Sequence, residues 1–123
     1  MRYLLDTDVL IDFLNDQKYA NQLIPILASK GPLFMSVITI AELSAGFNQN
    51  QADFYLPKLY DMVTVLDLDR KLAELAGQFR KKYNKSIADM LIAATAAVSK
   101  CQLVTRNKKD FPMPEVKFYH LEE

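Results

Sequence analysis

Three acidic residues in this sequence stand alone among apolar neighbours. Asp6 follows a short apolar run, Glu42 is the only charged residue between residues 36 and 47, and Asp89 is the only one between residues 86 and 98. A carboxylate in apolar surroundings is costly to bury, so each of these residues needs a local partner or a chemical role. Carboxylates that meet at one place repel one another, and Mg²⁺ or Mn²⁺ relieves the repulsion because both ions take oxygen ligands. Such an ion can activate water for attack on a phosphodiester.

The loop that follows residue 104 offers a fourth polar group, which is either Asn107 or Asp110. Residues for other kinds of chemistry are scarce. His120 is the only histidine, and we interpret it as structural or solvent-facing, so no Ser-His-Asp or Cys-His set can be assembled around it. The sequence also has no Gly-rich phosphate loop and no cluster of zinc ligands.

Two of the three acids also have a purely structural interpretation. Ser86 is a good N-cap with Asp89 three residues later, which is close to a capping box, and an acid in the first turn favours the helix dipole. Thr39 and Glu42 have the same spacing, but they form a capping box only if their helix begins later than Val37. The recurrence of an isolated acid in three separate segments favours a shared site.

The segments that must position these acids alternate between strand and helix patterns. Short apolar strands are predicted at residues 3–5, 33–35, 63–66, 102–104 and 116–121. Helices are predicted between the strands. The first covers residues 9–15 with Asp8 as N-cap, the second lies near 19–27 with a kink or shortening at Pro25, and the third runs from Val37 to about Gly46 with Ser36 as N-cap. A fourth covers 54–62 after a polar connector at 48–52, a fifth follows the N-cap Asp69, and a sixth covers 86–98. The alternation predicts an α/β fold with a mostly parallel central sheet of four to five short strands and helices on both faces. Asp6 then stands at the carboxyl end of the first strand, where open α/β sheets form their sites.

Length and composition point to a single compact domain spanning residues 1–123. The chain is 50% hydrophobic, with three Gly and five Pro, so it can bury a core and is not of low complexity. We see no signal-peptide pattern and no apolar run that reaches the length of a membrane span. Cys101 is the only cysteine, which fits a reducing cytoplasm.

The charges are unevenly distributed, although the net charge is zero. Residues 1–69 carry nine acids and four bases, a net of −5, whereas residues 80–110 carry eight bases and two acids, a net of +6. A basic region on a neutral protein is a possible footprint for a polyanion. The alternative is a solvated surface, and it suits residues 80–82 well because cations favour a helix C-terminus.

Four motifs, in order over essentially the whole chain, give the sequence a resemblance to PIN-domain ribonucleases, and specifically to VapC-type toxins of bacterial and archaeal toxin–antitoxin pairs. The motifs are residues 4–11 (LLDTDVLI), residues 36–43 (SVITIAEL) with Gly46, residues 87–94 (IADMLIAA), and residues 103–107 (LVTRN) with Asp110-Phe111. The resemblance implies a PIN-like fold and a Mg²⁺- or Mn²⁺-dependent endoribonuclease that cuts tRNA or other structured RNA. It also implies a small VapB-like antitoxin as partner, and a homodimer.

The resemblance assigns roles to particular residues. Asp6, Glu42 and Asp89 match the family's acidic positions, so Asp6 and Asp89 would hold the metal most directly, and Glu42 would complete its coordination or position the attacking water. The fourth acidic position falls at Asn107, an amide, and Asp110 is a possible substitute for the missing charge.

The remaining assignments concern support for the ligands and contacts with partners. Thr7 and Thr105 are expected to hydrogen-bond the carboxylates or a water, and Asp8, where the family often has Asn or Ser, is expected to cap a helix or support the ligands. The cations expected to grip RNA phosphates are Lys85, Arg106, Lys108 and Lys109. The aromatic residues Phe54, Tyr55 and Tyr60 are either core or an apolar contact surface.

Two other functions compete with the ribonuclease. Asp6-Thr7-Asp8 after a strand also looks like the nucleophile motif of haloacid-dehalogenase-type phosphatases, but Leu10 departs from that motif and no downstream lysine motif follows. Alternatively, with an amide at Asn107, the chain is a PIN-fold module that binds RNA or a partner without cutting.

Overall fold

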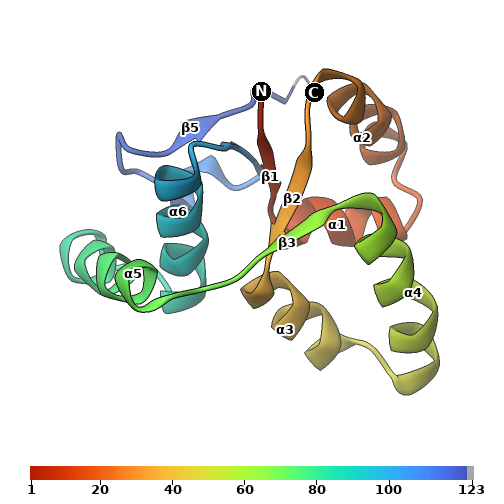
Figure 1. The fold of residues 1–123 in the computed structure, drawn as a ribbon, viewed down its shortest axis with the longest axis horizontal. Coiled ribbons are helices and arrows are strands. Elements are labelled where there is room, and N and C mark those ends of the chain that lie inside the picture. The colour runs from red at the N-terminus through yellow and green to blue at the C-terminus, as the bar shows by residue number, and fades with distance from the viewer. Residues whose placement is uncertain (122–123) are drawn as a thin grey trace.

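The computed structural model describes residues 1–121 as a sheet between two layers of helices (Figure 1). In chain order its elements are β1 (Tyr3–Leu5), α1 (Thr7–Leu14), α2 (Lys18–Lys30), β2 (Leu33–Ser36), α3 (Val37–Gly46), α4 (Gln49–Met62), β3 (Thr64–Leu66), α5 (Arg70–Tyr83), α6 (Ile87–Ser99), β4 (Gln102–Val104), the 3₁₀ helix η1 (Lys108–Asp110) and β5 (Lys117–Phe118). The predicted α/β fold is confirmed.

The sheet has the strand order β3-β2-β1-β4-β5, and every neighbouring pair is parallel. Leu4 in the central strand β1 pairs with Phe34 of β2 on one side and with Leu103 of β4 on the other. From β1 the chain first builds outward through β2 and β3 and then returns to the other side of β1 with β4. The carboxyl ends of β1 and β4 therefore flank the point where the strand order reverses, which is where open α/β sheets bind ligands.

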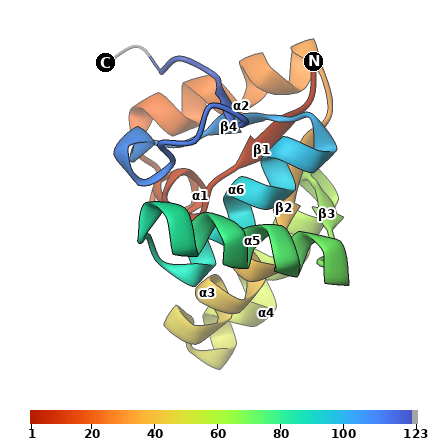
Figure 2. The same cartoon turned by 90° about the vertical axis from the view of Figure 1, so that its left-hand side faces the viewer.

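Alternate residues of the strands pack in two separate hydrophobic cores, one on each face of the sheet. Leu4, Phe34 and Leu103 point to one face and pack in a cluster with buried residues of α5 and α6. Their neighbours Tyr3 and Met35 point to the other face, in a cluster with residues of α1 to α4. The two views show α5 and α6 side by side on one face of the sheet (Figures 1 and 2). This arrangement holds the sheet between two apolar layers, as short parallel strands require.

The helix α6 is the most deeply buried helix, and its small side chains explain how it packs. Its buried residues include Ala93, Ala94 and Ala96, which let the helix approach the sheet and α5 closely. Ser86 caps it as predicted, because the Ser86 hydroxyl oxygen accepts a hydrogen bond from the Asp89 N–H at 3.1 Å. The predicted caps Ser36 of α3 and Asp69 of α5 are also confirmed.

The predicted start of α1 is wrong. The helix begins at Thr7, and its N-cap is Asp6, whose Oδ1 accepts a hydrogen bond from the Thr7 N–H at 2.8 Å. Asp8 lies inside the first turn instead of preceding it. The strand therefore passes into the helix without an intervening loop, and Asp6 belongs to the junction itself.

Three other boundaries differ from the predictions. The helix α2 runs unbroken through Pro25, because Pro25 and Asn21 are both exposed and water can bond the Asn21 carbonyl that Pro25 leaves without a donor. The predicted polar connector at 48–52 is instead the start of α4, where Asn48 and Gln51 form a capping box. The last strand is confined to Lys117–Phe118 and does not span residues 116–121.

None of the helices in residues 1–121 combines the length and the apolar character that crossing a membrane requires.

The capping box of α4 yields a prediction about stability. Asn48→Ala removes the oxygen that accepts the Gln51 N–H at 2.9 Å, so we expect it to lower the free energy of unfolding by about 1 kcal/mol. Urea denaturation measures the change. Asn50→Ala, in the first turn of the same helix, is the matched control and should be nearly neutral; an equal loss in both variants would contradict the capping role.

Candidate active site at the carboxyl edge of the sheet

Asp6 occupies the junction between β1 and α1, beside the end of β4. Its side chain is buried, with only 6% of the residue exposed. The Asp6 Oδ1 accepts the Thr7 N–H, and the Asp6 Oδ2 accepts the Thr105 hydroxyl at 2.8 Å. The Asp6 N–H in turn donates to the Val104 carbonyl oxygen at 3.0 Å. The two neighbouring strands therefore hold this carboxyl in one orientation.

The electrostatic surroundings of Asp6 disfavour its charged form. Burial is the largest cause, the negative charge of Asp8 is the next, and that of Asp89 adds to them; together they raise the pKa of Asp6 to about 7. The hydrogen bonds from Thr105 and Thr7 act in the opposite direction. The site thus concentrates negative charge around a buried carboxyl, and a nearby cation would favour ionisation.

Asp89 approaches the site from the first turn of α6. It is half-buried, and burial is the main cause that raises the pKa of its carboxyl, with the charge of Asp110 acting in the same direction. Hydrogen bonding with Ser86 and the charge of Lys85 lower this pKa. The structural interpretation and the chemical one are therefore compatible, because the backbone of Asp89 receives the cap while its carboxylate contributes to the field at Asp6.

Glu42 reaches the site through a threonine. It lies on α3 and is exposed, and its Oε1 accepts the Thr7 hydroxyl at 2.7 Å. The Thr7 Oγ1 also lies 3.0 Å from the hydroxyl oxygen of the buried Thr39. Thr39 was not predicted in this role, although its position three residues before Glu42 places both on one side of α3. These contacts link α3 to the residue that follows Asp6.

Asp8 and Asn107 lie against each other at the mouth of the site. Asp8 is half-buried, its Oδ1 accepts the Val9 N–H at 2.8 Å, and its Oδ2 accepts the Asn107 side-chain amide at 2.9 Å. A longer bond of 3.3 Å joins the Arg106 N–H to the same Oδ2. Burial raises the pKa of the Asp8 carboxyl. Asp110, in η1, is half-buried and acts electrostatically on Asp89.

The donor set suits a hard divalent cation that keeps part of its water shell. In residues 1–121 no group of three or more His, Cys, Asp and Glu side chains is gathered closely enough to enclose an ion. Mg²⁺ commonly binds through one or two carboxylates, with water and substrate phosphates completing its shell. Asp6 and Asp89 are the candidate pair, because the negative charge of Asp89 acts on the Asp6 carboxyl.

Comparison with known proteins identifies the family. The family model for the PIN domain matches residues 3–117. The chain is 34% identical to Ribonuclease VapC10 of Mycobacterium tuberculosis over 117 residues, which cover 91% of this chain and 87% of the relative.

This chain belongs to the PIN-domain family of VapC ribonucleases. A toxin–antitoxin complex from Klebsiella pneumoniae contains a similar chain, with 28% identity, a TM-score of 0.78, and coverage of 93% of this chain and 94% of that one. VapBC2 from Rickettsia felis, bound to a promoter DNA fragment, shares the fold, with 23% identity, a TM-score of 0.86, and coverage of 99% and 100%. Membership in this family sets the phosphatase interpretation of Asp6 aside.

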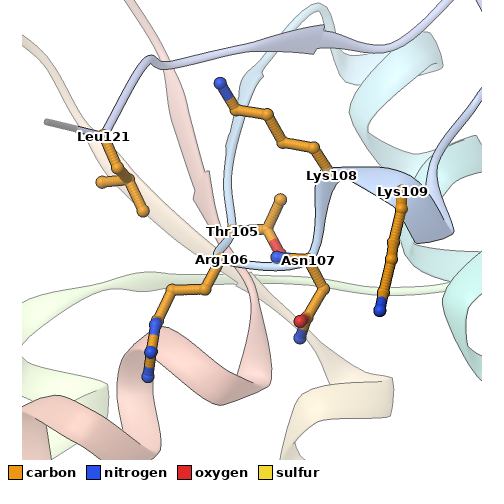
Figure 3. Close-up of a pocket in the computed structure, with 6 residues that line it drawn as sticks. All are labelled: Thr105, Arg106, Asn107, Lys108, Lys109 and Leu121. Carbon is orange, nitrogen blue, oxygen red and sulfur yellow. The ribbon is translucent and has the colours of Figure 1, made fainter. Parts of the chain in front are cut away.

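Residues 105–109 form a basic loop that lines an open pocket of about 450 Å³, and two of its residues, Thr105 and Asn107, hydrogen-bond Asp6 and Asp8. The lining residues, drawn in Figure 3, are Thr105, Arg106, Asn107, Lys108, Lys109 and Leu121. The side chains of Arg106, Asn107 and Lys109 point to one side of the loop, whereas Lys108 points to the other. The Lys108 Nζ lies 3.0 Å from the Nδ1 of the exposed His120.

Besides Lys108, two more of the four cations predicted to bind RNA lie beside other side chains. Arg106 donates to the Asp12 carboxylate at 3.0 Å, and its guanidinium lies 5.5 Å from the centre of the Tyr19 ring. Asp12 also accepts a hydrogen bond from the Tyr19 hydroxyl. Asp12 was not among the predicted site residues, although it lies four residues after Asp8 on the same face of α1. Lys85 lies beside Asp89 and does not line the pocket.

The raised pKa of Asp6 predicts how the metal-free protein responds to pH. The unfolded chain ionises Asp6 near pH 3.8, whereas the folded one does so near pH 7. The stability that Asp6 contributes is therefore fully present below pH 3.8 and is lost as the pH rises through about 7, by about 4 kcal/mol in total. We expect urea unfolding in EDTA to show a more stable protein at pH 5 than at pH 7.5.

The matched variant for this measurement is Asp6→Asn, whose side chain does not titrate. We expect it to lose most of the stability difference between the two pH values, because the remaining contributions come from Asp8 and Asp89, whose pKa values are also raised. A difference of the same size in Asp6→Asn would assign the pH dependence to other groups.

Proposed function

We propose that this protein is the toxin of a toxin–antitoxin pair and acts as a metal-dependent endoribonuclease. The observation that carries the proposal is the buried carboxyl of Asp6, whose pKa is raised to about 7 by burial and by the acids Asp8 and Asp89. In a chain of the VapC ribonuclease family, such a cluster suits a divalent cation and a phosphodiester substrate.

Asp6 and Asp89 are the residues that would hold a Mg²⁺ or Mn²⁺ ion, with Glu42 as a third ligand or as the group that positions the attacking water. A bound divalent ion supplies a more acidic water and stabilises the charge that develops on the phosphate. Thr105 fixes the orientation of the Asp6 carboxylate, and Thr7 fixes that of Glu42. Glu42 is exposed, so its carboxylate can accept a hydrogen bond from a water at the edge of the site.

The substrate we propose is a structured RNA such as tRNA, held by the basic loop. Lys108 and Lys109 are exposed and line the pocket, so their charges can pair with RNA phosphates there. Arg106 can take part if the phosphate competes with Asp12 for its guanidinium. Lys85 lies nearer to Asp89, and its positive charge lowers the pKa of the Asp89 carboxyl.

The partner we propose is a small VapB-like antitoxin. This proposal is supported by the relative from Klebsiella pneumoniae, which was solved in a toxin–antitoxin complex. The homodimer and the cytoplasmic location expected from the sequence remain predictions. Phe54 is 65% exposed and Tyr60 45% exposed on α4, so the aromatic segment offers an apolar surface to a partner.

The central prediction concerns metal-dependent cleavage. We expect the antitoxin-free protein to cut total RNA into discrete fragments with Mg²⁺ or Mn²⁺ and not with EDTA. Asp89→Asn should reduce the rate at least about 100-fold, because it removes a charge from the ion-binding pair while the Ser86 cap remains. Asp61→Asn on α4, a matched loss of one charge outside the site, should cut like the wild type.

Two results would count against the proposal. Full cleavage by a well-folded Asp89→Asn variant would remove Asp89 from the machinery. RNA binding without cleavage under any metal condition would favour a binding module that does not cut.

A second prediction tests the grip on RNA. In the Asp89→Asn background, Lys108→Ala with Lys109→Ala should weaken RNA binding and reduce the slope of log K against log salt by about one to two. Fluorescence anisotropy at several salt concentrations measures both. Lys81→Ala with Lys82→Ala, at the exposed end of α5, is the matched control. An equal loss of RNA affinity in the control pair would mean that RNA does not bind preferentially at the basic loop.

A further inference from the structure

A second pocket opens between α2 and the segment that follows β5. Its volume is about 320 Å³, and it is lined by aromatic, aliphatic and amide side chains, which are those of Tyr19, Gln22, Leu23, Ile26, Tyr119, His120 and Leu121. None of the residues that line it in the described part of the chain is acidic. We call this hollow the aromatic pocket, because three of its side chains are aromatic rings.

The aromatic pocket adjoins the pocket of the basic loop. Leu121 lines both of them. The Arg106 guanidinium lies 5.5 Å from the centre of the Tyr19 ring. The Lys108 Nζ lies 3.0 Å from the His120 Nδ1. Each of these contacts joins a cation of the basic loop to a ring of the aromatic pocket, so a ligand with a phosphate on the loop can extend into the aromatic pocket.

Contacts outside the pocket hold its two tyrosine rings in place. The Tyr19 hydroxyl donates a hydrogen bond to the Asp12 carboxylate. The Tyr119 N–H donates to the Leu103 carbonyl oxygen at 3.0 Å, and the Tyr119 ring meets the buried Tyr3 ring edge-on, with 5.9 Å between their centres. Tyr19 and Tyr119 are half-buried, so part of each side chain remains accessible. Rings that are fixed in advance lose little freedom when a ligand binds.

Polar and positively charged groups surround the aromatic pocket. The Lys108 ammonium can only donate, so the His120 Nδ1 accepts, and the ring proton of the neutral imidazole lies on Nε2, which can donate. Gln22 is exposed, and its amide offers both donors and an acceptor. The Lys30 Nζ lies 5.8 Å from the centre of the Tyr119 ring and adds another positive charge. These groups suit a ligand that has donors and acceptors on its edge and carries negative charge nearby.

We propose that the aromatic pocket binds an unpaired nucleobase of the RNA whose phosphates lie on the basic loop. The inference rests on the proposed ribonuclease function. A nucleobase has flat apolar faces and an edge of donors and acceptors, and stacking on aromatic rings beside a basic groove is how proteins bind single-stranded nucleic acid. A base inside a duplex is paired and stacked and cannot enter such a pocket. The RNA segment bound there is therefore single-stranded.

The binding test compares two ligands that carry the same phosphates and differ in their bases. One is a fluorescent oligoadenylate of about eight nucleotides, and the other is the same oligomer with abasic sites in place of its bases. Fluorescence anisotropy in EDTA measures the affinity of the antitoxin-free protein for each. Tyr119→Leu removes the ring and keeps apolar bulk, and Tyr119→Phe keeps the ring. Tyr60→Leu, at an exposed position on α4 outside the pocket, is the matched loss of a ring.

We expect the wild type to bind the oligoadenylate at least about fivefold more tightly than the abasic oligomer, because stacking of one base contributes this much or more. Tyr119→Leu should lose most of this difference, while its affinity for the abasic oligomer should stay at the wild-type value. Tyr119→Phe and Tyr60→Leu should keep the difference.

A second measurement needs no variant, so it does not depend on how Tyr119→Leu folds. The oligoadenylate carries a single 5-iodouridine, which forms photochemical crosslinks to aromatic side chains that stack on it. The complex with the wild-type protein is irradiated, and mass spectrometry identifies the crosslinked residue. We expect crosslinks at Tyr19, Tyr119 or His120.

The proposed base pocket would be overturned by any of four results. These are equal wild-type affinities for the two oligomers, an undiminished difference in Tyr119→Leu, an equal loss of affinity for both oligomers in Tyr119→Leu, and crosslinks that lie only outside the pocket. An undiminished difference would leave the pocket to another occupant, such as a side chain of a protein partner. A wild-type protein that binds neither oligomer at low salt would overturn the proposed RNA substrate as well, so that failure is distinguishable from the others.

Discussion

The parallel pairing of β1 with β4 is the contact on which the candidate site depends. It brings Thr105 to Asp6 across 99 residues of chain, and the hydrogen bond between them is buried. The apolar register of Leu4 with Leu103 fixes the two strands, so the carboxyl ends emerge side by side. The cores on both faces of the sheet stabilise this pairing, and the position of the site therefore follows from packing on the opposite sides of the same strands.

The same pairing forces negative charges together. Asp6 is buried and fixed by two donors, while Asp8 and Asp89 approach from the first turns of two different helices. First-turn positions favour acids because of the helix dipole, so the fold itself offsets part of the repulsion. The remaining repulsion adds to burial, which is the larger cause, in raising the pKa of Asp6. We infer that a divalent cation offsets the repulsion between these carboxylates, and that an RNA phosphate then binds to the cation.

Patterns that depend on neighbouring residues were predictable from the sequence, whereas contacts between distant segments were not. Ser86 and Asp69 were recognisable as caps because a cap acts within its own first turn. The start of α1 was misplaced because Asp6 and Asp8 are both good caps, and only the end of β4 decides between them. The partner of Asn107 and the engagement of Arg106 with Asp12 join segments more than 90 residues apart, which no local pattern encodes.

The central claim is that Asp6 and Asp89 together hold a divalent cation at the carboxyl edge of the sheet. Anomalous diffraction from crystals soaked in Mn²⁺ tests it most directly. We predict a manganese peak about 2 Å from a carboxylate oxygen of Asp6, within reach of Asp89 directly or through one water, and no such peak in Asp6→Asn crystals. A manganese ion bound elsewhere on the protein, with both carboxylates bare at a Mn²⁺ concentration that supports cleavage, would contradict it.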